Sequence, residues 1–363
     1  MTLSAKKFLK NINIYKPGKP IEELQREFNI KEIYKLASNE IPFPPLYLGK
    51  VVLEELKNVN RYPEANCFYL RKALAKKLRV KEAELIFGNG SDELIILALR
   101  GFISKGDEVL VGFPTFLIYE IQSQVEGAKI KRVPFSNYRY DLKAMARAVT
   151  KKTKIVFIAN PDNPHGTYLS HREVANFLEK IPRDILLFFD EAYYEFADKK
   201  DFPQTLSFLR KRGNIIISRT FSKAYGLAGL RIGYGITTPE IGQVLNKVRE
   251  PFNVNRFAQK CAYSALFNEA FLRKVKVHIK KEKGYLYKEF KKIDLEFIES
   301  VTNSVLVNFK EDVTPLYDYL LRKGVIIRSL NPWGLKNFFR LTVGLHKENR
   351  KFIHYLRKYL EVE

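Results

Sequence analysis

The segment Ser218-Arg-Thr-Phe-Ser-Lys-Ala-Tyr-Gly-Leu-Ala-Gly-Leu-Arg231 follows directly on the apolar run Asn214-Ile-Ile-Ile217. The run predicts a buried strand, and Lys223 lies just past its end, where a lysine is badly placed for packing. A lysine amine can form a Schiff base with an aldehyde, and desolvation lowers its pKa for that task. Ser222 and Arg231 are suited to binding a phosphate. The segment therefore predicts a site for a phosphorylated aldehyde, and a surface lysine in a Ser/Gly loop is the alternative.

Four further segments carry polar residues directly after an apolar run. Apolar runs at residues 84–87, 108–111, 154–158, 185–189 and 215–217 alternate with helical stretches. This alternation predicts a mostly parallel α/β sheet with strands buried on both faces. The polar segments 88–92, 114–116, 160–166, 190–193 and 218–223 all follow these strands. Ligands bind at the carboxyl edge of such sheets, so the five segments predict one shared site.

The flanking regions predict a second, smaller unit. Residues 1–47 indicate an N-terminal arm with a loop at 15–20 and an amphipathic helix at 21–28. Residues 48–250 form the predicted large domain. After Glu250-Pro251, a long lysine-rich helical stretch at about 255–292 is followed by short strands and helices. This pattern predicts a small α+β domain over residues 251–363, which the arm joins.

Composition limits the class of protein. The chain has 363 residues, 46% of them hydrophobic, which is typical of a globular protein with a substantial core. Cys67 and Cys261 lie far apart without metal-type spacing, so we expect no metal site and a reducing compartment. The first residues lack an apolar leader, and no stretch is long enough to span a bilayer. We therefore expect a soluble, cytoplasmic protein without a membrane partner.

The net charge of +23 leaves two interpretations open. Basic surfaces collect phosphates, so one is a nucleic-acid-binding regulator. The lysines are scattered, however, and form no stripe with interleaved aromatic residues. A solvated basic surface with anionic small ligands is therefore favoured, and we expect no specific nucleic-acid partner.

Together these segments resemble the histidinol-phosphate aminotransferases, a family of fold-type I enzymes that use pyridoxal 5'-phosphate (PLP). The resemblance rests on the segment around Lys223 and on Tyr15-Lys-Pro-Gly-Lys-Pro20, Leu36-Ala-Ser-Asn-Glu40, Arg61-Tyr-Pro-Glu64, Gly88-Asn-Gly-Ser-Asp-Glu93, Val248-Arg-Glu-Pro-Phe-Asn-Val-Asn255, Gly324-Val-Ile-Ile-Arg328 and Arg340-Leu-Thr-Val-Gly344. It implies a large domain with a mostly parallel mixed sheet and a smaller α+β domain. It also implies ping-pong transamination between histidinol phosphate and 2-oxoglutarate, with glutamate as amino donor, in a homodimer with shared active sites.

The resemblance assigns catalytic and ring-binding roles. Lys223 holds the cofactor and then shuttles a proton. Asp190 pairs with the pyridine nitrogen and keeps it protonated. Tyr193 and Asn163 contact the phenolic oxygen, and Phe116 stacks on the ring. The alternatives are a helix N-cap for Asp190, a turn for Asn163 and core packing for Phe116.

The phosphate and substrate contacts follow in the same way. A predicted helix N-terminus with neighbouring hydroxyl and guanidinium groups forms the phosphate cup: Ser91, Asp92, Thr220, Ser222 and Arg231. The resemblance implies that Tyr62 reaches the cofactor phosphate of the neighbouring subunit. It further implies that Arg340 and Arg328 bind the anionic groups of the substrates, with Asn163 beside them and Tyr15 closing over the site.

Three segments depart from the family pattern, and they leave other activities open. They are Asn39-Glu-Ile-Pro-Phe-Pro-Pro45, Asp162-Asn-Pro-His-Gly166 and Thr302-Asn-Ser304. These loops are nearer the substrate than the cofactor. The alternatives are therefore an aromatic amino-acid aminotransferase and a PLP-dependent decarboxylase of the threonine-phosphate type.

Overall fold

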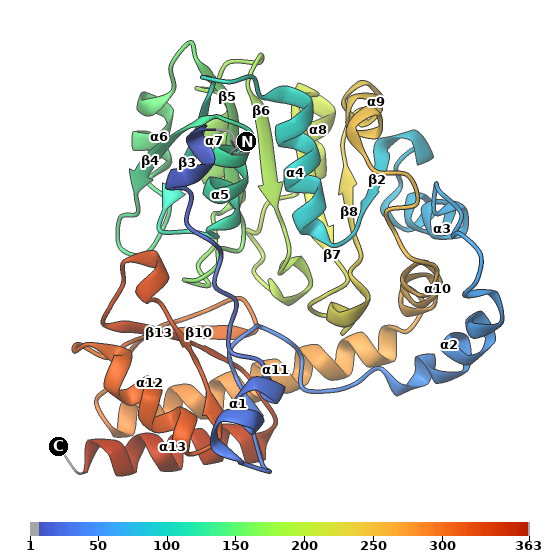
Figure 1. The fold of residues 1–363 in the computed structure, drawn as a ribbon. Coiled ribbons are helices and arrows are strands. Elements are labelled where there is room, and N and C mark those ends of the chain that lie inside the picture. Colours follow the sequence, from blue (N-terminus) through green and yellow to red (C-terminus); the bar gives the residue numbers. More distant parts are fainter. Residues whose placement is uncertain (1–6, 362–363) are drawn as a thin grey trace, which may run out of the picture.

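A seven-stranded sheet forms the centre of the larger part of the computed structural model, which describes residues 7–361 (Figure 1). The strands lie in the order β2 (Leu85–Gly88), β8 (Gly233–Ile236), β7 (Ile215–Thr220), β6 (Leu186–Asp190), β5 (Thr153–Ala159), β3 (Glu108–Phe113) and β4 (Lys129–Pro134). β8 runs antiparallel to both of its neighbours, and all other adjacent strands are parallel. The predicted mostly parallel α/β sheet is confirmed.

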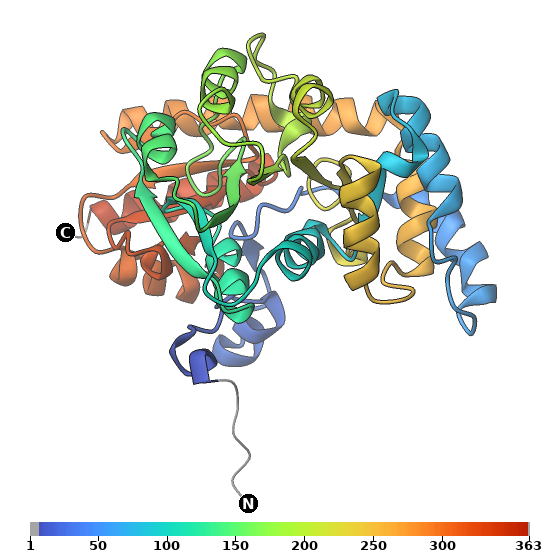
Figure 2. The same ribbon diagram turned by 90° about the horizontal axis from the view of Figure 1, so that it is seen from above.

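Helices cover both faces of this sheet, as Figure 2 shows from above. On one face, strand residues such as Phe188 and Ile216 pack against α4 (Ser91–Phe102), α5 (Ile118–Val125) and α9 (Pro239–Val248). On the other, Phe189 and Ile217 share a core with α3 (Phe68–Leu78), α6 (Leu142–Ala148), α7 (His171–Leu178), α8 (Thr205–Arg212) and α10 (Arg256–Ala265). Neighbouring residues of one strand enter opposite cores, so the strands read as continuous apolar runs.

Two strands of the sheet, β4 and β8, were not predicted from the sequence. β4 is an edge strand of sequence Lys-Ile-Lys-Arg-Val-Pro, which carries too many charges for a buried run. β8 reads Gly-Tyr-Gly-Ile. A Cβ at Gly233 would lie 2.6 Å from the Ser91 amide nitrogen, and one at Gly235 would lie 2.7 Å from the Ile86 side chain. The neighbouring atoms leave room only for glycine at these two positions. Because glycine has no apolar side chain, the sequence of β8 lacks the apolar run that indicates a strand.

The smaller part is built on a four-stranded antiparallel sheet. Its strands lie in the order β12 (Arg328–Ser329), β13 (Phe338–Thr342), β10 (Ser304–Asn308) and β9 (Glu296–Ile298). The helices α11 (Glu269–Lys292), α12 (Val313–Arg322) and α13 (His346–Leu360) contribute apolar residues to one core with this sheet. The predicted helical stretch at 255–292 was wrong in one respect: it is two helices, α10 and α11. The break occurs because the Asn268 side chain caps α11 by accepting from the Phe271 amide at 2.9 Å.

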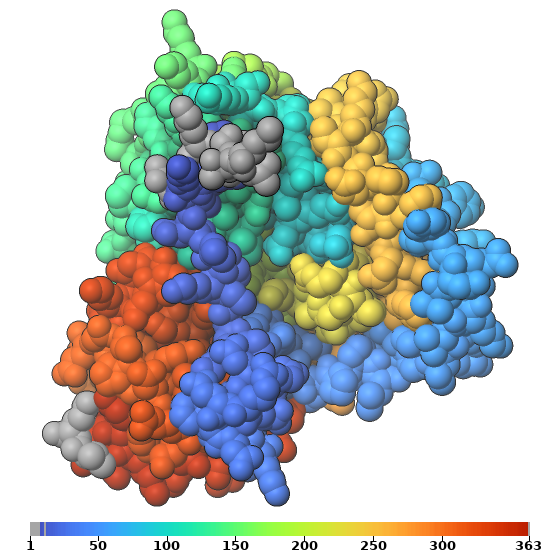
Figure 3. Space-filling view, viewed as in Figure 1, coloured from blue at the N-terminus to red at the C-terminus, as the bar shows by residue number. Residues whose placement is uncertain are grey.

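The N-terminal segment joins the smaller part. After α1 (Ile21–Phe28), strand β1 (Tyr34–Lys35) pairs in parallel with β11 (Val325–Ile326), and α2 (Gly49–Glu55) leads into the larger part. Figure 3 shows this segment along the boundary between the two parts. The predicted boundaries near residues 47 and 250 stay predictions, and residues 1–6 of the arm lie outside the described chain. Across residues 7–361, every helix is too short or too polar to cross a membrane.

Candidate active site

A cavity of about 230 Å³ lies at the carboxyl edge of the seven-stranded sheet. Segments that follow β2, β3, β5, β6 and β7 form its floor, and the smaller part and the N-terminal segment close it. All predicted site residues except Tyr62 line it: Tyr15, Ser91, Asp92, Phe116, Asn163, Asp190, Tyr193, Thr220, Ser222, Lys223, Arg231, Arg328 and Arg340. The predicted convergence of five strand ends on one site therefore exists in the structure.

Lys223 lies three residues beyond the end of β7 and points its amine into this cavity. Its Nζ donates to the Ser38 carbonyl oxygen at 3.1 Å. Burial lowers the pKa of Lys223 to about 8, and the positive charge of Arg340 acts in the same direction. Close to neutral pH, the amine is therefore far more often uncharged than an exposed lysine, which suits it to nucleophilic and proton-transfer roles.

Asp190 is the last residue of β6 and is only 6% exposed. Its carboxylate accepts from the Tyr119 hydroxyl at 2.7 Å and from the Ala192 amide at 3.1 Å. Burial raises the pKa of Asp190 to about 6, and the Tyr119 hydrogen bond opposes that rise. Tyr119 lies on the buried face of α5 and was not predicted as a site residue. Because no lysine, arginine or histidine of residues 7–361 forms an ion pair with this carboxylate, a positively charged ligand group would stabilise it.

Tyr193 carries a hydroxyl that is held in place by a second unpredicted residue, Asn39. The Asn39 side-chain amide donates to this hydroxyl at 2.8 Å, and the Thr342 hydroxyl donates to the Asn39 side-chain oxygen at 3.1 Å. Burial raises the pKa of Tyr193 to about 12. The hydroxyl therefore stays protonated at physiological pH and can donate into the cavity.

The start of α4 forms an anion cradle. Its N-cap residue, Gly90, has a φ of 81° and offers no side-chain cap, so amides of the first turn lack a capping partner. Arg231 extends over this end and lies 3.3 Å from both the Ser222 hydroxyl and an Asp92 carboxylate oxygen. A Cβ at Gly90 would lie 2.4 Å from the Arg231 guanidinium. Glycine thus lets amides and guanidinium converge, as phosphate binding requires.

Arg340 and Arg328 place two guanidinium groups on the opposite side of the cavity. They are paired in register on β13 and β12 and are 6% and 8% exposed. Arg340 donates to the Asn163 side-chain oxygen and to the Ala37 carbonyl, while its Nε has no partner. Among residues 7–361, no carboxylate pairs with either arginine. Burial lowers the pKa of both groups, so an anionic ligand would stabilise their charged forms.

The two aromatic residues predicted to contact the cofactor, Phe116 and Tyr62, differ in whether they line the cavity. Phe116 lines the cavity and packs edge-on against Tyr119, with ring centroids 5.5 Å apart. Tyr62 lies outside the cavity, is 78% exposed and stacks on Phe252 at 4.7 Å. Within one chain Tyr62 does not reach the site, and its predicted role depends on a second subunit.

The departure from the family pattern at Asp162-Asn-Pro-His-Gly166 has a clear structural basis. His165 is 2% exposed, and its Nδ1 lies 2.7 Å from the Asp162 carboxylate, which is 1% exposed. The same carboxylate accepts from the Thr115 hydroxyl at 2.6 Å. Thr115 precedes Phe116 and Asp162 precedes Asn163. The buried His165–Asp162 pair therefore connects the loop that carries Asn163 to the loop that carries Phe116.

Comparisons with known proteins agree with this geometry. The profile of the family "Aminotransferase class I and II" matches residues 31–356. Histidinol-phosphate aminotransferase of Moorella thermoacetica is 44% identical over 352 residues, covering 96% of this chain and 91% of that protein. Histidinol-phosphate aminotransferase 2 of Haemophilus influenzae is 41% identical over 359 residues, covering 98% of each.

The same relationship appears among solved structures. The crystal structure of histidinol-phosphate aminotransferase from Sinorhizobium meliloti in complex with pyridoxal-5'-phosphate has a TM-score of 0.90 at 27% identity, covering 99% of both chains. The fold-type I architecture predicted from the sequence is thereby confirmed. The chain belongs to the class I and II aminotransferases and, within them, to the histidinol-phosphate aminotransferase family.

Proposed function

We propose that this aminotransferase catalyses transamination between histidinol phosphate and 2-oxoglutarate, with glutamate as the amino donor in histidine biosynthesis, using PLP held in the 230 Å³ cavity. The observation that carries the proposal is the grouping of four features in one cavity. They are a lysine with a lowered pKa, a buried carboxylate, an anion cradle and two buried arginines that pair with no carboxylate of residues 7–361. The names of relatives at 41–44% identity point to the same substrate. The lining residues fit the cofactor in both charge and chemistry.

Each part of the cofactor has a matching group. Lys223 would be its attachment point, and Asp190 would face its pyridine nitrogen. The uncapped amides of α4, with Ser222 and Arg231, would hold its phosphate. Bound PLP supplies an electron sink for the substrate's amino carbon. Tyr193, kept protonated by burial, would donate to the phenolic oxygen.

Residues of the chain itself would transfer the protons and bind the anionic groups of the substrates. With a pKa near 8, the Lys223 amine is suited to take a proton from the amino-bearing carbon of the substrate and return one. Arg340 and Arg328 are suited to hold the phosphate of histidinol phosphate in one half-reaction and the carboxylates of 2-oxoglutarate or glutamate in the other. This double use of two guanidinium groups supports a ping-pong sequence. Tyr15 lines the cavity from the N-terminal segment and would exclude water.

A homodimer is part of the proposal, as is a cytoplasmic location. α10 packs against α2 and α3, and this side of the molecule exposes a group of apolar side chains. The group comprises Leu46, Leu53, Leu56, Val59, Tyr62, Phe68, Tyr69, Phe252, Tyr263 and Phe267. Contiguous exposed patches of this kind are typical of association surfaces. A second copy is the occupant favoured here, because it would also bring Tyr62 to the cofactor phosphate of its partner.

The substrate assignment is tested by a half-reaction. Purified PLP-loaded enzyme is mixed with one amino donor at a time, and the visible absorbance of the bound cofactor is followed. Histidinol phosphate should bleach it at least tenfold faster than phenylalanine, since one charge-assisted contact to phosphate is worth roughly a factor of ten. Faster bleaching by phenylalanine would assign the aromatic activity, and carbon dioxide release from threonine phosphate would assign the decarboxylase.

The role of Lys223 is tested in the same way. Lys223→Ala should lack the visible absorbance of lysine-bound cofactor altogether.

The role of Asp190 is tested through Tyr119→Phe. Loss of the hydroxyl removes a hydrogen bond that favours the charged carboxylate, so the pKa of Asp190 rises. The acidic limb of the pH profile of kcat/KM should move upward by about one pH unit, as expected for a hydrogen bond to a charged group. Tyr168→Phe removes a similar tyrosine–carboxylate bond, to Asp201 at 2.9 Å, away from the catalytic cavity and should leave the limb in place. An unmoved limb in Tyr119→Phe would separate Asp190 from the titration that controls activity.

The dimer is tested by charge insertion at Leu53, which is 67% exposed on α2. Leu53→Glu would place a carboxylate against the apolar surface of a second copy, and sedimentation velocity should show dimer converted to monomer. Val277→Glu alters a side chain of similar exposure, 62%, on α11 and should remain dimeric. A wild-type protein that sediments as a monomer at micromolar concentration would remove the homodimer from the proposal.

A further inference from the structure

A second cavity, of about 550 Å³, lies between the two parts of the molecule and shares no residue with the catalytic cavity. The larger part contributes Thr167 and Tyr168 after β5 and Phe196, Asp198 and Lys199 after β6. The smaller part contributes the middle of α11 and residues 299–301. The cavity is large enough to enclose a metabolite-sized ligand.

The face that α11 presents to this cavity is unusual. Lys276, Lys280, Lys283, Gly284 and Tyr287 line it at spacings of four, three, one and three residues, which place them on one stripe of the helix. A helix stripe that faces another layer of a protein is ordinarily apolar. Like charges at i and i+4 and a central glycine both weaken a helix. A Cβ at Gly284 would meet nothing within 4 Å, so packing does not account for the glycine.

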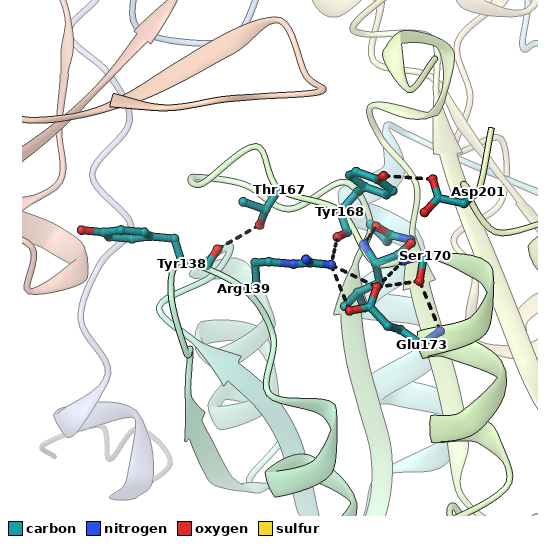
Figure 4. Close-up of polar contacts among 9 residues, drawn as sticks. Tyr138, Arg139, Thr167, Tyr168, Ser170, Glu173 and Asp201 are labelled. Carbon is teal, nitrogen blue, oxygen red and sulfur yellow. Dashed lines mark hydrogen bonds and ion pairs between the residues drawn. The ribbon is translucent and has the colours of Figure 1, made fainter. Parts of the chain in front are cut away.

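The arginine at the rim of the cavity, Arg139, is paired with a carboxylate outside it. Figure 4 shows Arg139 reaching away toward Glu173, with its guanidinium 3.0 Å from both carboxylate oxygens and 2.9 Å from the Tyr168 carbonyl. The Tyr168 hydroxyl in turn donates to Asp201. These contacts fix the wall of the cavity, and they leave the lysines as its source of positive charge.

The lysines carry more charge than their neighbours neutralise. Lys280 lies 3.2 Å from Asp198, and this pair is satisfied. Among the described residues, Lys199 and Lys276 have no carboxylate within ion-pair distance. Lys199 and Lys276 also border an adjoining cavity, whose lining includes Lys77, Arg219 and Glu195. Glu299 is the one acidic residue of the lining left to oppose them.

Lys283 is the most enclosed of these lysines. Its amine donates to the carbonyl oxygens of Ser300 at 2.6 Å and Thr302 at 2.8 Å and pairs with no carboxylate. Burial lowers the pKa of Lys283 to about 8. An anion in the cavity would restore its charged form. The amine is therefore positioned for a ligand whose charge the chain itself does not supply.

We propose that this cavity is a second binding site, for a small polyanion of the phosphate class such as an oligophosphate or a nucleoside polyphosphate. Ammonium groups act as point charges that suit clustered phosphate oxygens, whereas planar carboxylates favour the guanidinium fork that is occupied here. A ligand in the cavity would touch both parts of the molecule. It would also lie next to the Val301 amide, which donates to the Gly166 carbonyl at 2.9 Å in the loop that carries Asn163.

The site is tested by calorimetric titration of PLP-loaded enzyme with inorganic pyrophosphate and, separately, with ATP. Lys276→Gln/Lys280→Gln removes two charges from the cavity. Lys281→Gln/Lys288→Gln removes two from exposed positions of the same helix outside the cavity lining. The first pair should weaken binding about tenfold or more, and the second by less than about twofold. Gly284→Leu, which fills the cavity and keeps every charge, should also abolish binding.

Binding of pyrophosphate and ATP alike would identify the oligophosphate as the recognised group, and binding of ATP alone would identify the nucleotide. Equal weakening in the two double variants would reduce the effect to diffuse surface charge and overturn the proposal. Unchanged binding in all variants would place the ligand elsewhere, including the catalytic cavity, and absence of binding would also overturn it. Turnover of the variants should stay near wild type, since none of the altered residues lines the catalytic cavity.

Discussion

The buried carboxylate of Asp190 is the constraint on which the catalytic cavity depends. It ends a central strand, between β5 and β7, where water is excluded and a negative charge is costly. The Tyr119 hydroxyl and the Ala192 amide stabilise it only in part, because burial still raises the pKa of Asp190 to about 6. In the function proposed above, a protonated ring nitrogen would be the partner of this carboxylate. The ion pair would then be completed by the cofactor, and cofactor binding would be selective for a basic heteroaromatic ring.

The other charged groups of the cavity are arranged around that pair. Arg231 and the uncapped start of α4 are the groups proposed to bind the cofactor phosphate, whereas Arg328 and Arg340 lie on strands of the smaller part and are proposed to bind the substrate. Both of these guanidinium groups are buried, and within the described part of the chain neither pairs with a carboxylate. The positive charge of Arg340 also helps to depress the pKa of Lys223, which burial lowers most. An anionic substrate bound at Arg340 would oppose this effect, so that substrate binding would be coupled to the protonation state of the Lys223 amine.

Sequence patterns predicted the parts of the fold that depend on continuous burial. The apolar runs of β5, β6 and β7 identified the strands, and the polar residues at their ends identified Asp190, Asn163 and Lys223. Tyr119 was missed because a tyrosine on the apolar face of a helix is indistinguishable from core packing until its hydroxyl is seen on Asp190. β8 was missed because two of its four residues are glycines, which make room for the start of α4 and contribute no apolar side chain to indicate a strand.

Contacts between distant segments were the least accessible to sequence reasoning. Asn39 lay within a recognised motif, yet its bond to Tyr193 depends on the N-terminal segment returning through β1 to the smaller part. The grouping of the α11 lysines also depends on how distant segments pack. In the sequence these lysines were interpreted as part of a scattered basic surface. Folding brings three of them onto one stripe opposite residues 167–168, around open space that Gly284 leaves unfilled. A high net charge can therefore conceal a local charge imbalance, because only the packing of the two parts against each other decides which lysines line the same cavity.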